Sequence, residues 1–177
     1  MDQDLGGGTF ETEADERPDW ARDLVAFDLQ AEAFRNGGDL PARFTADGDE
    51  LSPAIAWGRP PEGTRSLALL VEDPDAPGGT FTHWMIVGLR PQAGDLVEGR
   101  GADPSDVAGA QALTNDFGEV GWGPPAPPPG PPHRYRFRLL ALDFAPKLPA
   151  TARRPNFDAA CAGRVIAEAD LTATYGR

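Results

Sequence analysis

Only a few side chains in this sequence could do chemistry at a shared site, and they stand at or near the ends of predicted strands. The two histidines, His83 and His133, each begin an apolar run that predicts a strand, and each follows a turn-rich segment. Asp73 ends another such run, and Tyr135 lies two residues beyond His133. Because a rigid scaffold displays functional groups on loops and at strand ends, we expect these four side chains to line one pocket.

Three kinds of chemistry could use this set, although either histidine alone would more often only satisfy hydrogen bonds at a strand end. A metal could bind two histidines and a carboxylate, but no HExxH motif or close histidine pair fixes the ligand geometry. An Asp–His pair could activate a nucleophile, yet there is no GxSxG motif, and the single cysteine, Cys161, falls in a predicted helix. An anion pocket needs no further partner, because imidazole, phenol and backbone N–H groups all donate hydrogen bonds. We therefore favour an anion pocket, with no metal, no cofactor and no catalytic residue.

Glycines and an acid complete the predicted pocket. Gly121 and Gly123 would let a loop backbone approach the ligand closely. We expect Asp73 to lie beside His83, and its carboxylate would fix the tautomer and orientation of one imidazole or compensate its positive charge.

The elements that position these residues are mainly strands. The chain has 21 glycines and 19 prolines with short apolar runs between them, which is typical of all-β proteins. Alternating or continuous apolar residues predict strands at 24–30, 54–57, 65–73, 82–89 and 134–143. One helix is predicted at about 156–169. The segment 99–132 shows little regular structure, so we expect a functional loop whose proline-rich part forms a rigid wall; an exposed partner-docking segment is the alternative.

Composition limits the classes of partner. The 177 residues predict a single domain over 21–177, preceded by a flexible acidic arm over 1–20. A net charge of −12 argues against nucleic acid or anionic membrane as partners. The acidity fits either adaptation to high salt or a biased genome composition. One cysteine excludes an internal disulfide, no apolar run reaches about 20 residues, and the N-terminus has no signal-peptide pattern, so we expect a cytoplasmic protein.

Several motifs resemble the phosphatidylethanolamine-binding protein family, and most closely its bacterial and archaeal branch, often described as Raf-kinase-inhibitor-like. They are "DPDAP" at 73–77, "THW" at 82–84, and "GPPAPPPGPPHRYRFRLLALD" at 123–143. "DGDELSPAIAWGRPPEGTRSLALLVED" and "NDFGEVGWGPP" support the match, which covers about residues 24–177.

The resemblance implies a β-sandwich of two antiparallel sheets with one or two peripheral helices, one of them C-terminal. It also implies a small pocket for phosphate, sulfate, acetate or a phosphorylated head group. By this resemblance the pocket is lined by Asp73, His83, His133 and Tyr135, with Gly121 and Pro127 or Pro128 as its wall. A strained or cis peptide is implied near Pro74 or Pro77.

The sequence departs from the family pattern at three positions, where Trp122, Pro124 and Arg164 replace the usual tyrosine, glycine and histidine. The resemblance also leaves two other functions open. The protein could inhibit or regulate a protein partner, such as a kinase or protease, or it could be a slow hydrolase. A homodimer and an unidentified protein partner are likewise left open.

Overall fold

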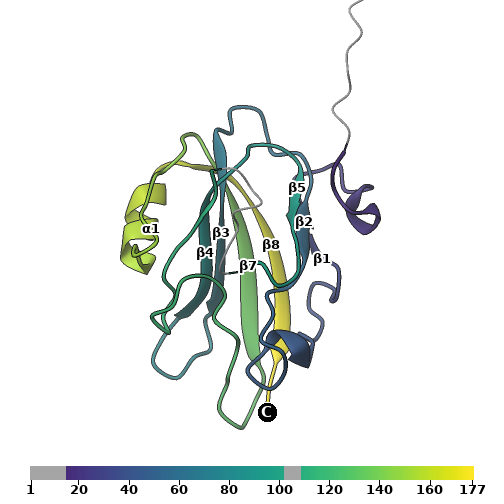
Figure 1. Ribbon diagram of the computed structural model, residues 1–177, viewed down its shortest axis with the longest axis vertical. Coiled ribbons are helices and arrows are strands. Elements are labelled where there is room, and N and C mark those ends of the chain that lie inside the picture. The colour runs from purple at the N-terminus through teal and green to yellow at the C-terminus, as the bar shows by residue number, and fades with distance from the viewer. Residues whose placement is uncertain (1–14, 102–108) are drawn as a thin grey trace, which may run out of the picture.

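The apolar runs form two antiparallel β-sheets that pack face to face, as expected for a β-sandwich (Figure 1). The computed structural model describes residues 15–101 and 109–177. The smaller sheet has the order β1-β2-β5 and the larger has the order β6-β4-β3-β7-β8. The strands are β1 (Leu29–Ala31), β2 (Ile55–Trp57), β3 (Ser66–Asp73), β4 (Phe81–Leu89), β5 (Gly94–Leu96), β6 (Gln111–Ala112), β7 (His133–Leu142) and β8 (Val165–Tyr175). The helical segments are α1 (Arg154–Cys161) and the short 3-10 turns η1 (Asp19–Ala21) and η2 (Ala42–Phe44).

Strand β3 is buried over its whole length because both of its faces are covered. Leu67, Leu69 and Val71 face the core between the two sheets. Ala68 and Leu70 face a second core beneath α1. The continuous apolar run at 65–73 therefore corresponds to a central strand, as predicted.

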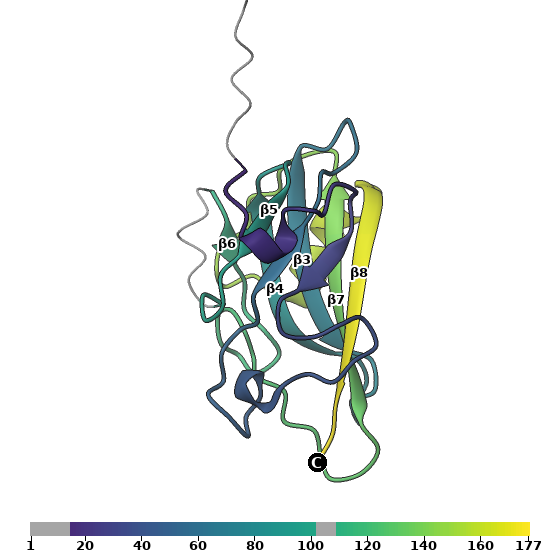
Figure 2. The same ribbon diagram turned by 90° about the vertical axis from the view of Figure 1, so that its right-hand side faces the viewer.

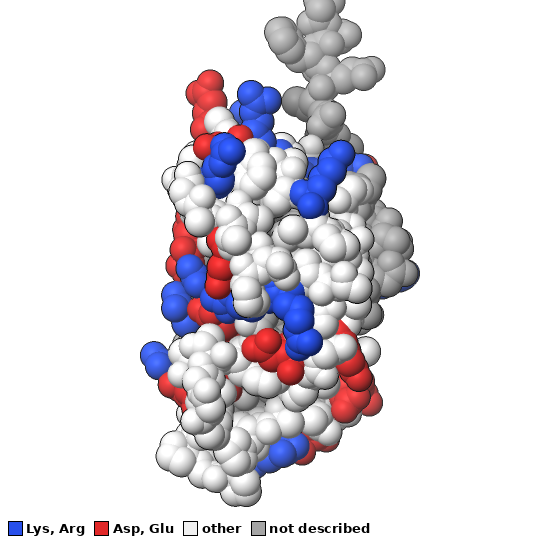
Figure 3. Space-filling view, turned by 90° about the vertical axis from the view of Figure 1, so that its left-hand side faces the viewer, with Lys and Arg blue, Asp and Glu red and all other residues white. Residues whose placement is uncertain are grey.

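The two faces of strand β7 have different surroundings. Tyr135, Phe137 and Leu139 face the core between the sheets. Figure 2 shows β7 behind the strands of the smaller sheet. Arg136 and Arg138 point to the opposite face, where both form ion pairs with Glu72. Blue and red side chains stand side by side on the face that carries α1 (Figure 3). The predicted alternation of this strand is confirmed.

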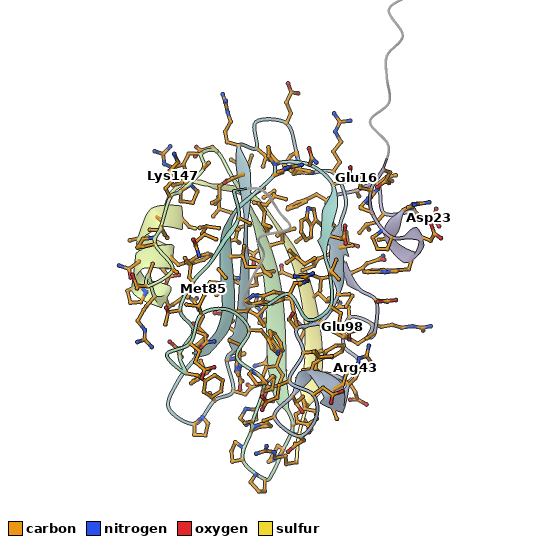
Figure 4. All side chains as sticks on the ribbon, in the orientation of Figure 1. Glu16, Asp23, Arg43, Met85, Glu98 and Lys147 are labelled. Carbon is orange, nitrogen blue, oxygen red and sulfur yellow. The ribbon has the colours of Figure 1, made fainter. Side chains whose placement is uncertain are left out.

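The second core joins the helix to the larger sheet. Met85 of β4 lies between the sheet and α1 (Figure 4), in a cluster with Phe157 and Cys161. Burial raises the pKa of the Cys161 thiol to about 11, so the thiol stays protonated at neutral pH. This cysteine therefore belongs to the packing of the helix.

The order of the larger sheet explains why the candidate residues meet. Strand β3 lies between β4 and β7 and is antiparallel to both. The C-terminal end of β3 therefore lies at the same edge as the N-terminal ends of β4 and β7. Asp73, His83 and His133 stand at or near these three ends.

Three expectations about local structure were wrong. The helix predicted at 156–169 ends at Cys161, and Val165–Tyr175 forms β8 instead. Gly163 turns the chain at φ 73°, and from Ala167 onwards every second residue faces the core, which is a strand period. The strand predicted at 24–30 is limited to Leu29–Ala31, because it pairs with β2 at only three positions. The cis alternative for the peptide near Pro74 or Pro77 was also wrong, because all peptide bonds of the described residues are trans.

The expected acidic arm, residues 1–20, lies mostly outside the described residues. In its described part, Arg17 is buried and donates hydrogen bonds to the carbonyl oxygens of Leu24 and Trp57. Asp15 pairs with the same guanidinium, and this lowers the pKa of its carboxyl to about 2. The chain is thus already packed against the smaller sheet at Arg17.

Candidate functional site

A cavity of about 140 Å³ opens at the edge of the larger sheet where β3 ends and β4 and β7 begin. Six of the seven residues predicted for the site line it: Asp73, His83, Pro127, Pro128, His133 and Tyr135. Five further residues, all apolar, complete the lining: Ala76, Pro77, Phe81, Phe117 and Ala126. The cavity therefore combines a few buried polar groups with an apolar wall, as small-molecule sites commonly do.

Asp73 pairs with His133. Its Oδ2 lies 2.7 Å from Nδ1 of His133, and the two residues are only 3% and 8% exposed. The other carboxylate oxygen, Oδ1, accepts a hydrogen bond of 2.8 Å from the backbone N–H of Asp75. The turn at Asp75 therefore holds the Asp73 carboxylate in place, and the carboxylate holds the Nδ1 edge of the His133 imidazole. Asp73 therefore orients the imidazole of His133, whereas His83, beside which we expected Asp73 to lie, feels its charge without a hydrogen bond between them.

His83 is held by the loop instead. Its Nδ1 lies 2.7 Å from the carbonyl oxygen of Gly123, and the N–H of Gly123 donates to the carbonyl oxygen of His83 at 2.7 Å. A Cβ atom at Gly123 would lie 2.5 Å from the Phe117 ring, so this close approach requires glycine. Burial lowers the pKa of the His83 imidazole. This ring is therefore neutral over a wider pH range than a free histidine.

A β-bulge places His83 at the cavity. Val71 pairs with Trp84 and Glu72 pairs with Thr82, so His83 is the extra residue of β4. A bulge breaks the strict alternation of a strand and redirects a side chain. Thr82 therefore faces the side of α1, where its hydroxyl accepts a hydrogen bond from Arg154, while His83 lines the cavity.

Tyr135 adds a hydroxyl group to the cavity. Its ring meets that of His83 edge to face, with 5.3 Å between the centroids. Burial raises the pKa of the Tyr135 phenol, so the group stays protonated. Within the described residues, its hydroxyl and both Nε2 atoms of His83 and His133 form no hydrogen bond. Three polar groups are therefore available to a ligand.

Gly121 does not line the cavity. Its N–H donates to the carbonyl oxygen of Leu113, and its own carbonyl oxygen accepts from the side chain of Asn115. With φ at 97°, it adopts the left-handed conformation that this part of the loop requires. The neighbouring Trp122 also does not line the cavity. It belongs to the core, where its indole N–H donates to the carbonyl oxygen of Phe44 and its ring packs edge to face on Trp84.

Sequence reasoning missed the aromatic part of the lining. Phe81 and Phe117 pack edge to face with 4.7 Å between the centroids, and both rings approach His83. Phe117 is 48% exposed, which is high for a large apolar residue. Phe81 could have been found as an apolar residue beside the "THW" motif. Phe117 stands in the "NDFGEVGWGPP" motif of the expected functional loop, but an apolar residue in a loop did not by itself indicate a place in the lining.

The proline-rich wall is fastened from outside. Arg177 binds the Asp47 carboxylate through Nε and Nη2, at 2.9 and 2.8 Å, and Tyr175 donates to the same carboxylate. This arrangement lowers the pKa of the Asp47 carboxyl. The Nη1 of Arg177 also donates to the carbonyl oxygen of Pro127 at 3.3 Å. The wall of the cavity thus depends on a clasp formed by residues distant in the sequence.

The cavity holds little fixed positive charge. Its lining, over the described part of the chain, contains a carboxylate and two imidazoles but no lysine or arginine. Arg134 lies close in sequence to His133 but pairs with Asp75 outside the lining, and lowers the pKa of that carboxyl to about 2. The described residues include no cluster of three or more His, Cys, Asp or Glu side chains that could hold a metal ion.

Comparison with known proteins identifies the family. The family model described as phosphatidylethanolamine-binding protein matches residues 30–176. UPF0098 proteins of Aquifex aeolicus and Methanothermobacter thermautotrophicus are 41% and 40% identical over 147 and 149 residues, covering 82% and 84% of this chain and 85% and 98% of theirs. Of this chain, 85% superimposes on 98% of E. coli YbcL, a structure described as a member of the mammalian PEBP family, with a TM-score of 0.80 and 30% identity.

A homologue from Chlamydia trachomatis, CT736, gives a TM-score of 0.77 with 32% identity, covering 86% of this chain and 98% of that one. These relatives come from bacteria and an archaeon. The "DPDAP" turn and the "HRY" strand start, which suggested the resemblance, lie within the matched region. The chain belongs to the phosphatidylethanolamine-binding protein family, in its bacterial and archaeal branch.

Proposed function

We propose that the protein binds a small anion, such as phosphate or a phosphorylated head group, in the cavity at the ends of β3, β4 and β7. One observation carries the proposal: the buried hydrogen bond between Asp73 and His133. A carboxylate behind an imidazole compensates the charge of the imidazolium form. The Nε2–H of that imidazolium is then available to form a charge-assisted hydrogen bond with an anion.

Two neighbouring groups support the same proposal. The Tyr135 hydroxyl can donate a second hydrogen bond, since burial keeps it protonated. The apolar wall, which includes Phe81, Phe117 and Pro127, lowers the local dielectric constant and so strengthens electrostatic interactions inside the cavity. Because the lining of the described chain holds no lysine or arginine, the positive charge for the anion comes from His133.

Calorimetric titration with methylphosphonate at about pH 5.5 tests the proposal. We expect wild type to bind, and His133→Ala to bind roughly ten- to a hundredfold more weakly, as for loss of a hydrogen bond to a charged group. Tyr135→Phe should weaken binding by a smaller factor. Asp75→Asn is the matched control, because Asp75 lies in the same turn as Asp73 but outside the lining. Failure of wild type to bind, or equal affinity in His133→Ala, would overturn the proposal.

The physiological ligand is best sought by mass spectrometry of small molecules that copurify with the protein. A regulatory role, inhibition of a kinase or protease, and a homodimer stay predictions. A panel of chromogenic esters and phosphates tests the hydrolase alternative.

Within the described residues no helix is long and apolar enough to cross a membrane. A cytoplasmic location stays a prediction that cell fractionation can test. The test matters because one relative, from Mycobacterium tuberculosis, is named as a lipoprotein.

A further inference from the structure

We propose that the cavity selects anions that also donate a hydrogen bond. The preferred ligand class is the monoanion of a phosphate monoester or a phosphonate, which carries both a P–O⁻ and a P–OH group. Sulfates and sulfonates have a similar shape and charge but carry no proton. The inference rests on the proposed function, and it follows from the different surroundings of His83 and His133.

His83 can only accept a hydrogen bond from the ligand. A carbonyl oxygen accepts and never donates, so the contact between Nδ1 of His83 and the oxygen of Gly123 requires the proton on Nδ1. A neutral imidazole carries one N–H, and its other nitrogen is an acceptor. The Nε2 of His83 therefore presents a lone pair to the cavity.

The surroundings of His83 keep it neutral. The residue is 3% exposed, and aromatic rings approach it within 6 Å. The rings are those of Phe81, Phe117 and Tyr135, and the charged or titratable neighbours are Asp73, Asp116 and His133. The two carboxylates favour the imidazolium form, but burial outweighs them and lowers the pKa of His83.

His133 has the opposite role. The Asp73 carboxylate accepts from its Nδ1 and compensates the charge of the imidazolium, whose Nε2–H then donates. The cavity thus offers one imidazole donor and one imidazole acceptor. A phosphonate monoanion can place P–O⁻ at His133 and P–OH at His83. A sulfonate would leave the lone pair of His83 facing an anionic oxygen or nothing at all.

Methylphosphonate and methanesulfonate form a matched pair of probes. At about pH 5.5, just below the second pKa of about 6 of phosphate monoesters, both are predominantly monoanions, and they differ by one O–H group. We expect calorimetry to show methylphosphonate binding roughly ten- to a hundredfold more tightly, because a buried acceptor left unpaired is costly. In His83→Phe the ratio of the two affinities should fall to about one. In the control Asp75→Asn the ratio should stay as in wild type.

Nuclear magnetic resonance provides a test that needs no variant. The sequence has only two histidines, so ¹⁵N-histidine labelling gives just two sets of ring signals. We expect His83 to stay in the neutral form with the proton on Nδ1, both free and with methylphosphonate bound. Equal affinity for the two probes, or a His83 imidazolium in the complex, would overturn this inference alone. Absence of binding by both probes would overturn the proposed function as well.

Discussion

Replacing Asp73 with asparagine should change how ligand binding depends on pH. Oδ1 of Asp73 accepts a hydrogen bond from the backbone N–H of Asp75, and Oδ2 faces Nδ1 of His133. In Asp73→Asn the amide oxygen keeps the first contact, so the amide nitrogen faces His133. An amide nitrogen donates, so Nδ1 of His133 must accept and its proton moves to Nε2. The neutral ring of the variant then donates toward the cavity.

The magnitude follows from this exchange of tautomers. In wild type the neutral ring of His133 carries its proton on Nδ1, toward Asp73, so a hydrogen bond from Nε2 to sulfate requires the uptake of one proton. Affinity should therefore fall as pH rises, by at most tenfold, or about 1.4 kcal/mol, for each pH unit. In Asp73→Asn the neutral Nε2–H donates at every pH, and the dependence on pH should nearly disappear. At low pH the variant should bind roughly five- to tenfold more weakly, because a neutral hydrogen bond replaces a charge-assisted one.

Calorimetric titrations with sulfate between pH 5 and 8 measure both effects, because the charge of sulfate is constant over this range and only the protein titrates. Asp75→Asn should alter the pH dependence far less than Asp73→Asn, since the Asp75 side chain binds Arg134 outside the lining and acts on His133 through its charge alone. An unchanged pH dependence in Asp73→Asn would refute the assignment of Asp73 as the group that sets the His133 tautomer. A wild-type affinity that does not vary with pH would refute the role of the imidazolium.

Four further predictions concern stability and the cavity wall. Glu72→Ala should lower the free energy of unfolding by about 2 kcal/mol, and thermal unfolding should show a Tm lower by about 5 °C, because the variant leaves three arginines without a buried partner. Arg177→Ala frees the carbonyl of Pro127 and should weaken sulfate binding in calorimetry while His133→Ala remains the more severe variant. Arg134 holds the pKa of Asp75 at about 2, below the usual 3.8, so this pair stabilises the fold above pH 3.8; the contribution is lost as pH falls toward 2, and Asp75→Asn should flatten that part of a denaturation curve. With a net charge of −12, adaptation to high salt predicts that Tm rises in multimolar potassium chloride, whereas an equal or lower Tm would favour genome composition.

The sequence alone predicted the main strands that form the site and most of the residues at their ends. The continuous apolar run of β3 and the alternation of β7 are strong local signals, because a strand shows the burial of its two faces directly in its residue pattern. The positions of Asp73, His83 and His133 at strand ends, together with the "DPDAP" and "HRY" motifs, located six of the seven predicted residues at one cavity. Turn-forming prolines and glycines also marked the wall.

The sequence did not reveal features that depend on contacts between residues far apart in the chain. The apolar residues of the segment 165–169 suggested the end of a helix, but pairing with β7 at ten positions makes Val165–Tyr175 a strand. Gly121 has a left-handed conformation in the loop, yet only the packed structure shows that it faces Leu113 and Asn115 rather than the cavity. Phe117 joins the lining because its loop folds over β4.

The pairing of Asp73 was decided by tertiary structure. From the sequence, the nearer histidine was His83, only ten residues away. Strand β3 lies between β4 and β7, so the carboxylate at its end has a histidine on each side. The bulge in β4 turns His83 toward the carbonyl of Gly123, while regular pairing along β7 brings His133 to Asp73. The donor role proposed for His133 and the acceptor role proposed for His83 both follow from this arrangement, since the protonation of the ring nitrogen that faces the cavity is set by what the other nitrogen binds.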